Sequence, residues 1–146
     1  MTKLVGIALW AAVVVGAVVV DSQDVRAADP CRAGTVPGAK GECIACPGGS
    51  FSAAGATGCS PCAAGFFSGV GASACTPCAP GTSSKIGSLT CFTCAAGTFA
   101  SASASVSCTS CAANTFSSAG SVACTPCPAG TASPPAAAAC APAAKK

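Results

Sequence analysis

The sequence contains no histidine and no tyrosine, and only four of its 146 residues are acidic. General acid–base catalysis needs several titratable side chains in one cleft, and beyond residue 27 the only carboxylate side chains are Asp29 and Glu42. Calcium sites likewise depend on clustered carboxylates. The composition therefore predicts a protein that is not an enzyme and that holds no cofactor.

Positive charge is nearly as scarce as negative charge. Between Cys43 and Ala144 the only charged residue is Lys85, and no basic residues alternate with aromatic ones. Domains that bind nucleic acid carry a basic stripe or patch. We therefore expect no nucleic-acid partner.

Large apolar side chains are also few after the N-terminal segment. Apolar residues make up 51% of the chain, but many of them are Ala and Cys, and the whole chain has six Phe and one Trp. Residues 29–146 therefore lack the side chains for a conventional core of Leu, Ile, Val and Phe. Fourteen Cys in so short a chain indicate a fold held by cross-links or by metal.

The N-terminus has the features of an export signal. Lys3 precedes an apolar run over 4–20, and small residues suit cleavage after Ser22 or Ala27. We predict a signal peptide over residues 1–27, with an uncleaved, helical signal-anchor as the first alternative and a buried core helix as the second. The protein is then secreted or at the cell surface, and it contacts a membrane only through this segment, if at all.

From Cys31 to Cys140 one unit is repeated. In each unit an opening Cys is followed three residues later by a turn residue and then by a pair of small or aromatic residues. A Ser usually comes next, and a Gly-Ala step then precedes the closing Cys. Fourteen Cys allow on the order of 10⁵ pairings, so spacing alone does not settle the connectivity. The residues after Cys31 match those after the other opening Cys, and the simplest pairing then joins each opening Cys to its closing Cys. It defines modules 1 to 7: Cys31–Cys43, Cys46–Cys59, Cys62–Cys75, Cys78–Cys91, Cys94–Cys108, Cys111–Cys124 and Cys127–Cys140.

Two positions inside each module are informative. The third residue after the opening Cys is a turn former, Gly in six modules and Asn in one, as a left-handed turn requires. These residues are Gly34, Gly49, Gly65, Gly81, Gly97, Asn114 and Gly130. The fifth residue, called position +5 below, is Phe51, Phe67, Phe99 or Phe116 in four modules and Val36, Ser83 or Ala132 in the others. We expect these Phe to pack on neighbouring disulfides, the alternative being an exposed aromatic ladder for a partner.

These features predict a small disulfide-rich fold. Short, irregular hairpins over residues 28–140 are joined end to end in an elongated rod, with little regular secondary structure, a hydrophobic N-terminal helix and a short tail over 141–146. A disulfide that closes a loop of this size contributes about 3 kcal/mol in the chain-entropy model. A buried Phe contributes roughly 1.5–3 kcal/mol, so the cross-links dominate.

The repeat resembles a known module type. The sequence Cys-x-x-Gly-[Thr/Phe/Ser]-x-Ser, the Gly-Ala turn and Cys-x-Pro-Cys are similar to the cysteine-rich repeats of ephrin-type receptors. They also resemble the first module of tumour necrosis factor receptor cysteine-rich domains and tandem repeats in surface proteins of unicellular eukaryotes, including immobilisation-type antigens. The resemblance covers Cys31 to Cys140 and implies pairing of opening with closing Cys. It implies no receptor signalling, because the chain lacks the receptors' kinase and ligand-binding head.

The resemblance and composition favour a structural or protein-binding role, as an adhesion protein or stalk, with an unknown extracellular protein or glycan as partner. The first alternative is a fragment of a larger receptor or surface-antigen ectodomain. A disulfide-scaffold inhibitor is less favoured because all seven loops are alike. Zinc–thiolate sites would strand Cys31 and Cys140, and redox activity of a Cys-x-x-Cys pair would need nearby groups that lower the thiol pKa. The sequence names no ligand-binding residue.

Overall fold

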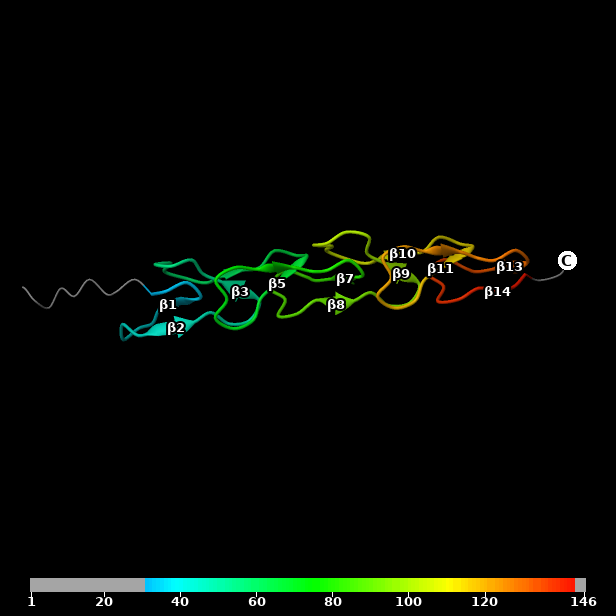
Figure 1. The fold of residues 1–146 in the computed structure, drawn as a ribbon. Helices are drawn as coiled ribbons and strands as arrows, with labels where there is room; N and C mark the ends of the chain where they lie inside the picture. The colour runs from blue at the N-terminus through cyan, green and yellow to red at the C-terminus, as the bar shows by residue number, and fades with distance from the viewer. Residues whose placement is uncertain (1–30, 144–146) are drawn as a thin grey trace, which may run out of the picture.

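The computed structural model describes residues 31–143, which form a thin rod of seven two-stranded antiparallel hairpins in chain order (Figure 1). No helix occurs among these residues, and the predicted disulfide-rich fold is confirmed. The predicted signal peptide and N-terminal helix lie outside the described residues. The hairpins are β1 (Thr35–Pro37) with β2 (Cys43–Ala45), β3 (Ser50–Phe51) with β4 (Ser60–Pro61), β5 (Phe66–Phe67) with β6 (Thr76–Pro77), β7 (Thr82–Ser83) with β8 (Phe92–Thr93), β9 (Thr98–Phe99) with β10 (Thr109–Ser110), β11 (Thr115–Phe116) with β12 (Thr125–Pro126), and β13 (Thr131–Ala132) with β14 (Ala141–Pro142).

Each hairpin starts from a tight turn after its opening Cys. In module 5 the backbone N–H and the hydroxyl of Thr98 both donate to the carbonyl of Ala95, at 3.0 and 2.8 Å. Gly97 lies between them with φ of 82°, as the third residue of a type II turn requires. The same turn, closed by a hydroxyl, recurs in six of the seven modules; module 3 has Phe66 in place of the Thr or Ser.

The second strand of each hairpin comes from the residues that follow the closing Cys. In module 3 this strand is Thr76–Pro77, at the edge of its two-stranded sheet, where a residue without an N–H is tolerated. The same holds at the C-terminal end, where Ala141–Pro142 form β14. The tail that the sequence analysis started at residue 141 therefore begins inside the last hairpin, because the returning strand lies beyond the disulfide.

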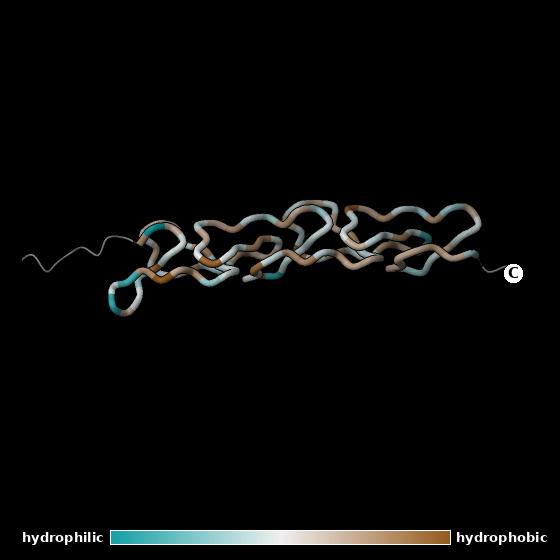
Figure 2. The backbone as a smooth tube through the Cα atoms, turned by 60° about the horizontal axis from the view of Figure 1, so that its bottom comes forward, coloured by the Kyte–Doolittle hydropathy of each residue, from teal (hydrophilic) through white to brown (hydrophobic). Residues whose placement is uncertain are grey.

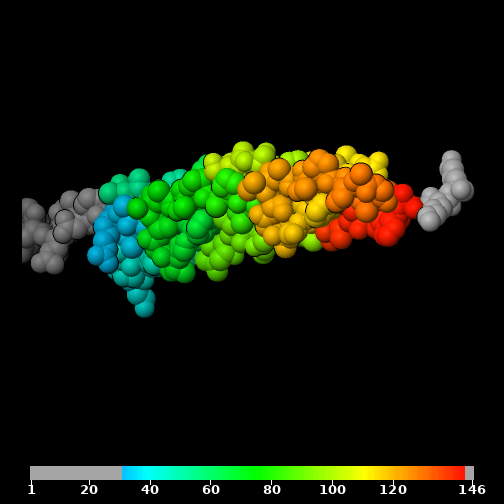
Figure 3. Space-filling view, turned by 45° about the vertical axis from the view of Figure 1, so that its right-hand side comes forward, coloured from blue at the N-terminus to red at the C-terminus, as the bar shows by residue number. Residues whose placement is uncertain are grey.

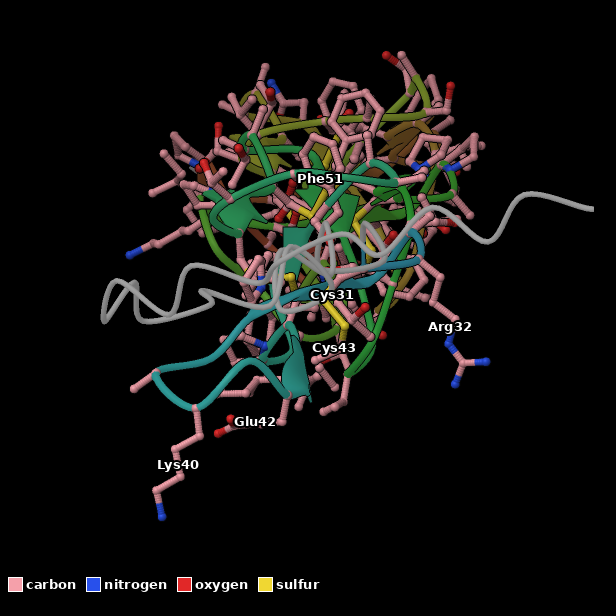
Figure 4. All side chains as sticks on the ribbon, turned by 90° about the vertical axis from the view of Figure 1, so that its left-hand side faces the viewer. Cys31, Arg32, Lys40, Glu42, Cys43 and Phe51 are labelled. Carbon is pink, nitrogen blue, oxygen red and sulfur yellow. A yellow bond between two sulfur atoms is a disulfide. The ribbon has the colours of Figure 1, made fainter. Side chains whose placement is uncertain are left out.

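Seven disulfides form the centre of the rod, with Cα–Cα distances of 5.6–5.7 Å: Cys31–Cys43, Cys46–Cys59, Cys62–Cys75, Cys78–Cys91, Cys94–Cys108, Cys111–Cys124 and Cys127–Cys140. The opening Cys of modules 2 to 6 are 0–1% exposed and are the most buried side chains described. Of the closing Cys, Cys43 is exposed and the other six are of intermediate exposure. Figure 4 shows the first of these disulfides from the N-terminal end of the rod.

Backbone hydrogen bonds join each module to the next. Between modules 3 and 4, Gly65 N donates to Ser84 O at 2.9 Å, and Gly87 N donates back to Cys62 O at 2.8 Å. A third bond runs from Ser68 N to Ser88 O at 3.3 Å. The first two bonds recur at all six junctions, and the third recurs at the last five, because module 1 has a proline, without an N–H, at that position. The modules are therefore linked by backbone pairing as well as by the covalent chain.

Contacts also reach two modules along the rod. The turn glycine of module 3, Gly65, packs so closely on the carbonyl oxygen of Ala104 in module 5 that a Cβ there would overlap it. The same relationship holds for the turn glycines of modules 1, 2, 4 and 5: Gly34, Gly49, Gly81 and Gly97. The modules are therefore not simply joined end to end, as the sequence suggested. They overlap along the length of the rod, which is continuous in the space-filling view (Figure 3).

Module 1 differs from the others by its hydrophilic loop. This loop is the teal hairpin tip at the N-terminal end in Figure 2. It is closed by a hydrogen bond of 2.7 Å from Gly38 N to Glu42 O and by one of 3.0 Å from Lys40 N to Glu42 Oε2. The side chains of Lys40 and Arg32 point away from the rod (Figure 4). Three of the four charged residues in the described part of the chain therefore lie in module 1.

Candidate functional site

The cysteines provide no reactive or metal-binding group in this structure. All fourteen are in disulfides. Within residues 31–143 no group of three or more His, Cys, Asp or Glu side chains is placed to hold a metal ion. The repeated cysteine pairs therefore act as cross-links here, and any functional surface has to be sought among the other residues.

The turn-forming residues are brought into one repeating position, but their surroundings differ. The turn glycines of modules 1 to 5 are buried, because each faces a turn two modules further on. Asn114 of module 6 and Gly130 of module 7 are exposed, with φ of 62° and 81°. No module lies two places beyond them among the described residues. The one position at which the sequence has Asn is thus a position where a side chain has room.

A row of buried serines connects consecutive modules. The Ser68 hydroxyl, whose residue is 3% exposed, donates to Ser50 O at 2.8 Å in the preceding module. Equivalent hydroxyls of the other modules donate at 2.9–3.1 Å: Ser52, Ser84, Ser117 and Ser133. In module 5 the residue is Ala100, which is 4% exposed and cannot make this bond. The sequence analysis saw these serines only as part of the repeat motif, because their partners lie 17–19 residues away.

The aromatic residues at position +5 are partly covered. Phe51, Phe67, Phe99 and Phe116 are all of intermediate exposure. Among residues 31–143 the most exposed aromatic side chain is Phe92, at 63%. It follows the closing Cys of module 4, a position that the sequence analysis did not single out.

Large exposed apolar side chains occur from the first to the sixth hairpin of the described residues, and the hairpin of module 4 has more of them than any other. That hairpin contributes Ile86 and Leu89 from its loop and Phe92 from its returning strand, each at least 55% exposed. It also carries Lys85, the only charged residue among the described residues after Glu42. A hollow of about 410 Å³ lies beside Phe92 and Lys85, where module 4 meets module 5. This hollow is the candidate binding site, and three serines and one cation line it together with apolar side chains.

The described part of the chain contains no helix that is long and apolar enough to cross a membrane.

Comparison with known proteins supports the module type. The family model described as tyrosine-protein kinase ephrin type A/B receptor-like matches residues 81–119 and, overlapping them, residues 97–140. The predicted resemblance to ephrin-type receptor repeats is therefore confirmed over modules 4 to 7, and modules 1 to 3 have the same hairpin and disulfide arrangement. No curated protein matches the chain. Repeats of this type with seven disulfides are typical of proteins on the oxidising side of a membrane.

Proposed function

We propose that this protein is a non-catalytic, extracellular rod that acts as a spacer or stalk and offers a protein-binding surface, as an adhesion protein does. The observation that carries the proposal is the overlap of modules one and two places apart, combined with a disulfide in every module. This arrangement favours a single extended shape over a chain of modules that move independently about flexible linkers. An extended, cross-linked shape suits a protein that holds a binding surface away from its attachment point.

The chemistry of the described residues agrees with this role. The most buried side chains are cysteines in disulfides and serines that donate to backbone carbonyls. Residues 31–143 contain four charged side chains, three of them in the first module. General acid–base catalysis, which requires neighbouring titratable groups, has no support in this inventory.

A test is to express the full chain in a secreting eukaryotic cell and follow where it goes. We expect the protein in the medium or at the cell surface, with no free thiols by alkylation and intact mass. Small-angle scattering should give a rod-like particle whose radius of gyration increases on reduction. Retention inside the cell with free thiols would contradict the proposal, and so would a compact, spherical particle.

A second candidate is a segment of a larger receptor or surface-antigen ectodomain. The family match favours it, because the matched family is described by its likeness to receptors. The mass of the native protein distinguishes the two candidates. A single species of the size of this chain favours a separate rod, and a much larger species that contains these peptides favours the ectodomain segment.

A further inference from the structure

The modules can be compared with one another position by position, and at one residue pair module 4 reverses the arrangement found in modules 2, 3, 5 and 6. In modules 2, 3, 5 and 6 the Phe at position +5 lies opposite a Ser or Thr on the returning strand: Ser60, Thr76, Thr109 and Thr125. In module 4 the residue at position +5 is Ser83, and its partner across the hairpin is Phe92. The aromatic ring and the hydroxyl have exchanged strands.

The exchange accounts for the hollow between modules 4 and 5. Ser83 Oγ lies 3.4 Å from Cys108 Sγ, so position +5 faces the closing disulfide of the following module. The neighbouring modules have a phenylalanine ring at this position, and module 4 has only a hydroxymethyl group. The hollow of about 410 Å³ is lined by both of these residues and by Phe92 and Val106. Its volume is sufficient for one aromatic side chain.

Two of the residues that line the hollow are apolar and well exposed. Phe92 is 63% exposed and Val106 is 60% exposed. Val106 belongs to module 5, whose disulfide loop is one residue longer than those of modules 2, 3, 4, 6 and 7. The strand exchange in module 4 and the longer loop of module 5 therefore meet at the same place. An exposed aromatic ring beside an apolar hollow is typical of binding surfaces.

The rim of the hollow carries a single positive charge. Lys85 lines it, and the only carboxylate side chain among residues 31–143 is Glu42, three modules away. A cation that has no acidic neighbour among residues 31–143 can attract an anionic group of a partner. Recognition here thus combines an apolar ring with an adjacent negative charge.

We propose that the hollow between modules 4 and 5 is the docking site for a partner protein that inserts an aromatic side chain next to a carboxylate. The inserted ring occupies the place that phenylalanine fills in the neighbouring modules and packs against Phe92 and Val106. The carboxylate pairs with the Lys85 ammonium. This proposal rests on the proposed protein-binding role and assigns that role to one site on the rod.

The test uses the secreted, oxidised full chain labelled with ¹⁵N and titrated with the peptide acetyl-Glu-Phe-amide. We expect saturable shifts confined to the amides of 83–85, 92 and 106–108. The decisive variant is S83F, which restores at module 4 the ring that four other modules carry and so fills the hollow. It should weaken binding at least tenfold. The matched control A132F makes a similar change at position +5 of module 7 and should leave binding unchanged.

Two further variants separate the ring from the charge. F92S installs the residue that module 2 has at this position and should weaken binding at least fivefold. K85S, which copies the residue of module 6, should weaken binding of acetyl-Glu-Phe-amide about two- to fivefold, as expected for an exposed ion pair. It should not affect the weaker binding of acetyl-Gln-Phe-amide. A complete set of seven disulfides in each variant, checked by mass, shows that the fold is intact.

The proposal is overturned if the wild-type chain does not bind the peptide at millimolar concentration. It is equally overturned if the shifts spread evenly over all modules, or if S83F and F92S bind as well as the wild type does. None of these results would change the thiol count or the scattering profile, so the rod would remain as the proposed function while this site would be withdrawn.

Discussion

Gly65 in module 3 lies directly against the carbonyl oxygen of Ala104 in module 5, although 39 residues separate them. The contact leaves no room for a Cβ, and Gly65 also has a φ of 86°. Glycine is thus required there for two separate reasons, backbone conformation and close approach. At Asn114 and Gly130 only the first reason applies, because no module lies two places further on among the described residues.

Replacing these glycines by alanine should separate the two requirements. Gly130→Ala introduces only the left-handed conformation, which costs about 1–2 kcal/mol. Gly65→Ala adds a steric overlap with module 5, and such overpacking costs a further 1–3 kcal/mol or so. We expect guanidinium unfolding, followed by circular dichroism, to give a clearly lower midpoint for Gly65→Ala than for Gly130→Ala. Equal losses would show that the contact between modules 3 and 5 is absent in solution.

The sequence was sufficient for the module and insufficient for the way modules overlap. Local signals define each hairpin: a turn residue at a fixed place after the opening Cys, a proline before the next opening Cys at three of the six junctions, and a disulfide that joins residues 12–14 apart. The overlap depends on the rotation and rise from one module to the next, which a period in the sequence does not contain. One sequence feature does reflect the overlap: the turn position is Asn in module 6, where it is exposed, and Gly in modules 1 to 5, where it is buried.

Replacing either of two alanines in the turn before the closing Cys by glycine should make the protein more stable. Ala104 and Ala136 have φ of 57° and 58°, where the equivalent residues of modules 2, 3, 4 and 6 are glycines. Ala104→Gly removes a strain of about 1–2 kcal/mol, offset by the roughly 0.4–1 kcal/mol that glycine adds through the unfolded chain. We expect a net gain of about 0.5–1 kcal/mol in thermal or denaturant unfolding.

The reverse change is the control for this turn. Gly87 has φ of 70° and no atom within 4 Å of where its Cβ would be, so Gly87→Ala should lose a similar amount. If the alanine and glycine forms were equally stable at both positions, the result would contradict a left-handed conformation at this turn.

The buried serine row predicts opposite effects at two equivalent sites. Ser68→Ala removes a buried hydrogen bond to Ser50 O and should cost about 1 kcal/mol. Ala100→Ser supplies the hydroxyl that module 5 lacks, aimed at the carbonyl of Thr82, and should gain up to about 1 kcal/mol. The free energies of unfolding of the two variants and their parent provide the check. A loss of stability in Ala100→Ser would mean that the oxygen finds no acceptor there.

The disulfides should differ in how many neighbouring modules become less stable when one of them is removed. Replacing both Cys of a pair by Ser removes about 3 kcal/mol in the chain-entropy model. In module 4 the loss should also loosen modules 2 to 6, because each contacts module 4 directly. In module 7 it should reach only modules 5 to 7. Hydrogen exchange of backbone amides, compared between C78S/C91S and C127S/C140S, measures this reach, and exchange confined to module 4 in the first variant would contradict the overlap.

The candidate binding site was also partly legible in the sequence. The repeat shows that position +5 is Phe in four modules and that Ser83 is one of the exceptions. Its importance depends on Phe92, nine residues further on, and only the strand register shows that the two residues face each other. The hollow exists because module 4 has no phenylalanine at position +5 and because the surrounding side chains, including Val106 of module 5, do not fill the space. The sequence alone does not show which side chains surround this position.

The disulfides also set an upper limit on how far the rod can be drawn out under tension. When each opening Cys is bonded to its closing Cys, the taut path crosses a module through a Cα–Cα distance of 5.6–5.7 Å instead of around its loop. Three Cα–Cα steps of about 3.8 Å then lead to the next module. The fully pulled chain from Cys31 to Cys140 thus measures on the order of 100 Å, compared with roughly 370 Å for the same residues without cross-links. While its disulfides are intact, the protein therefore cannot be stretched beyond this length, and reduction of the disulfides would remove the limit.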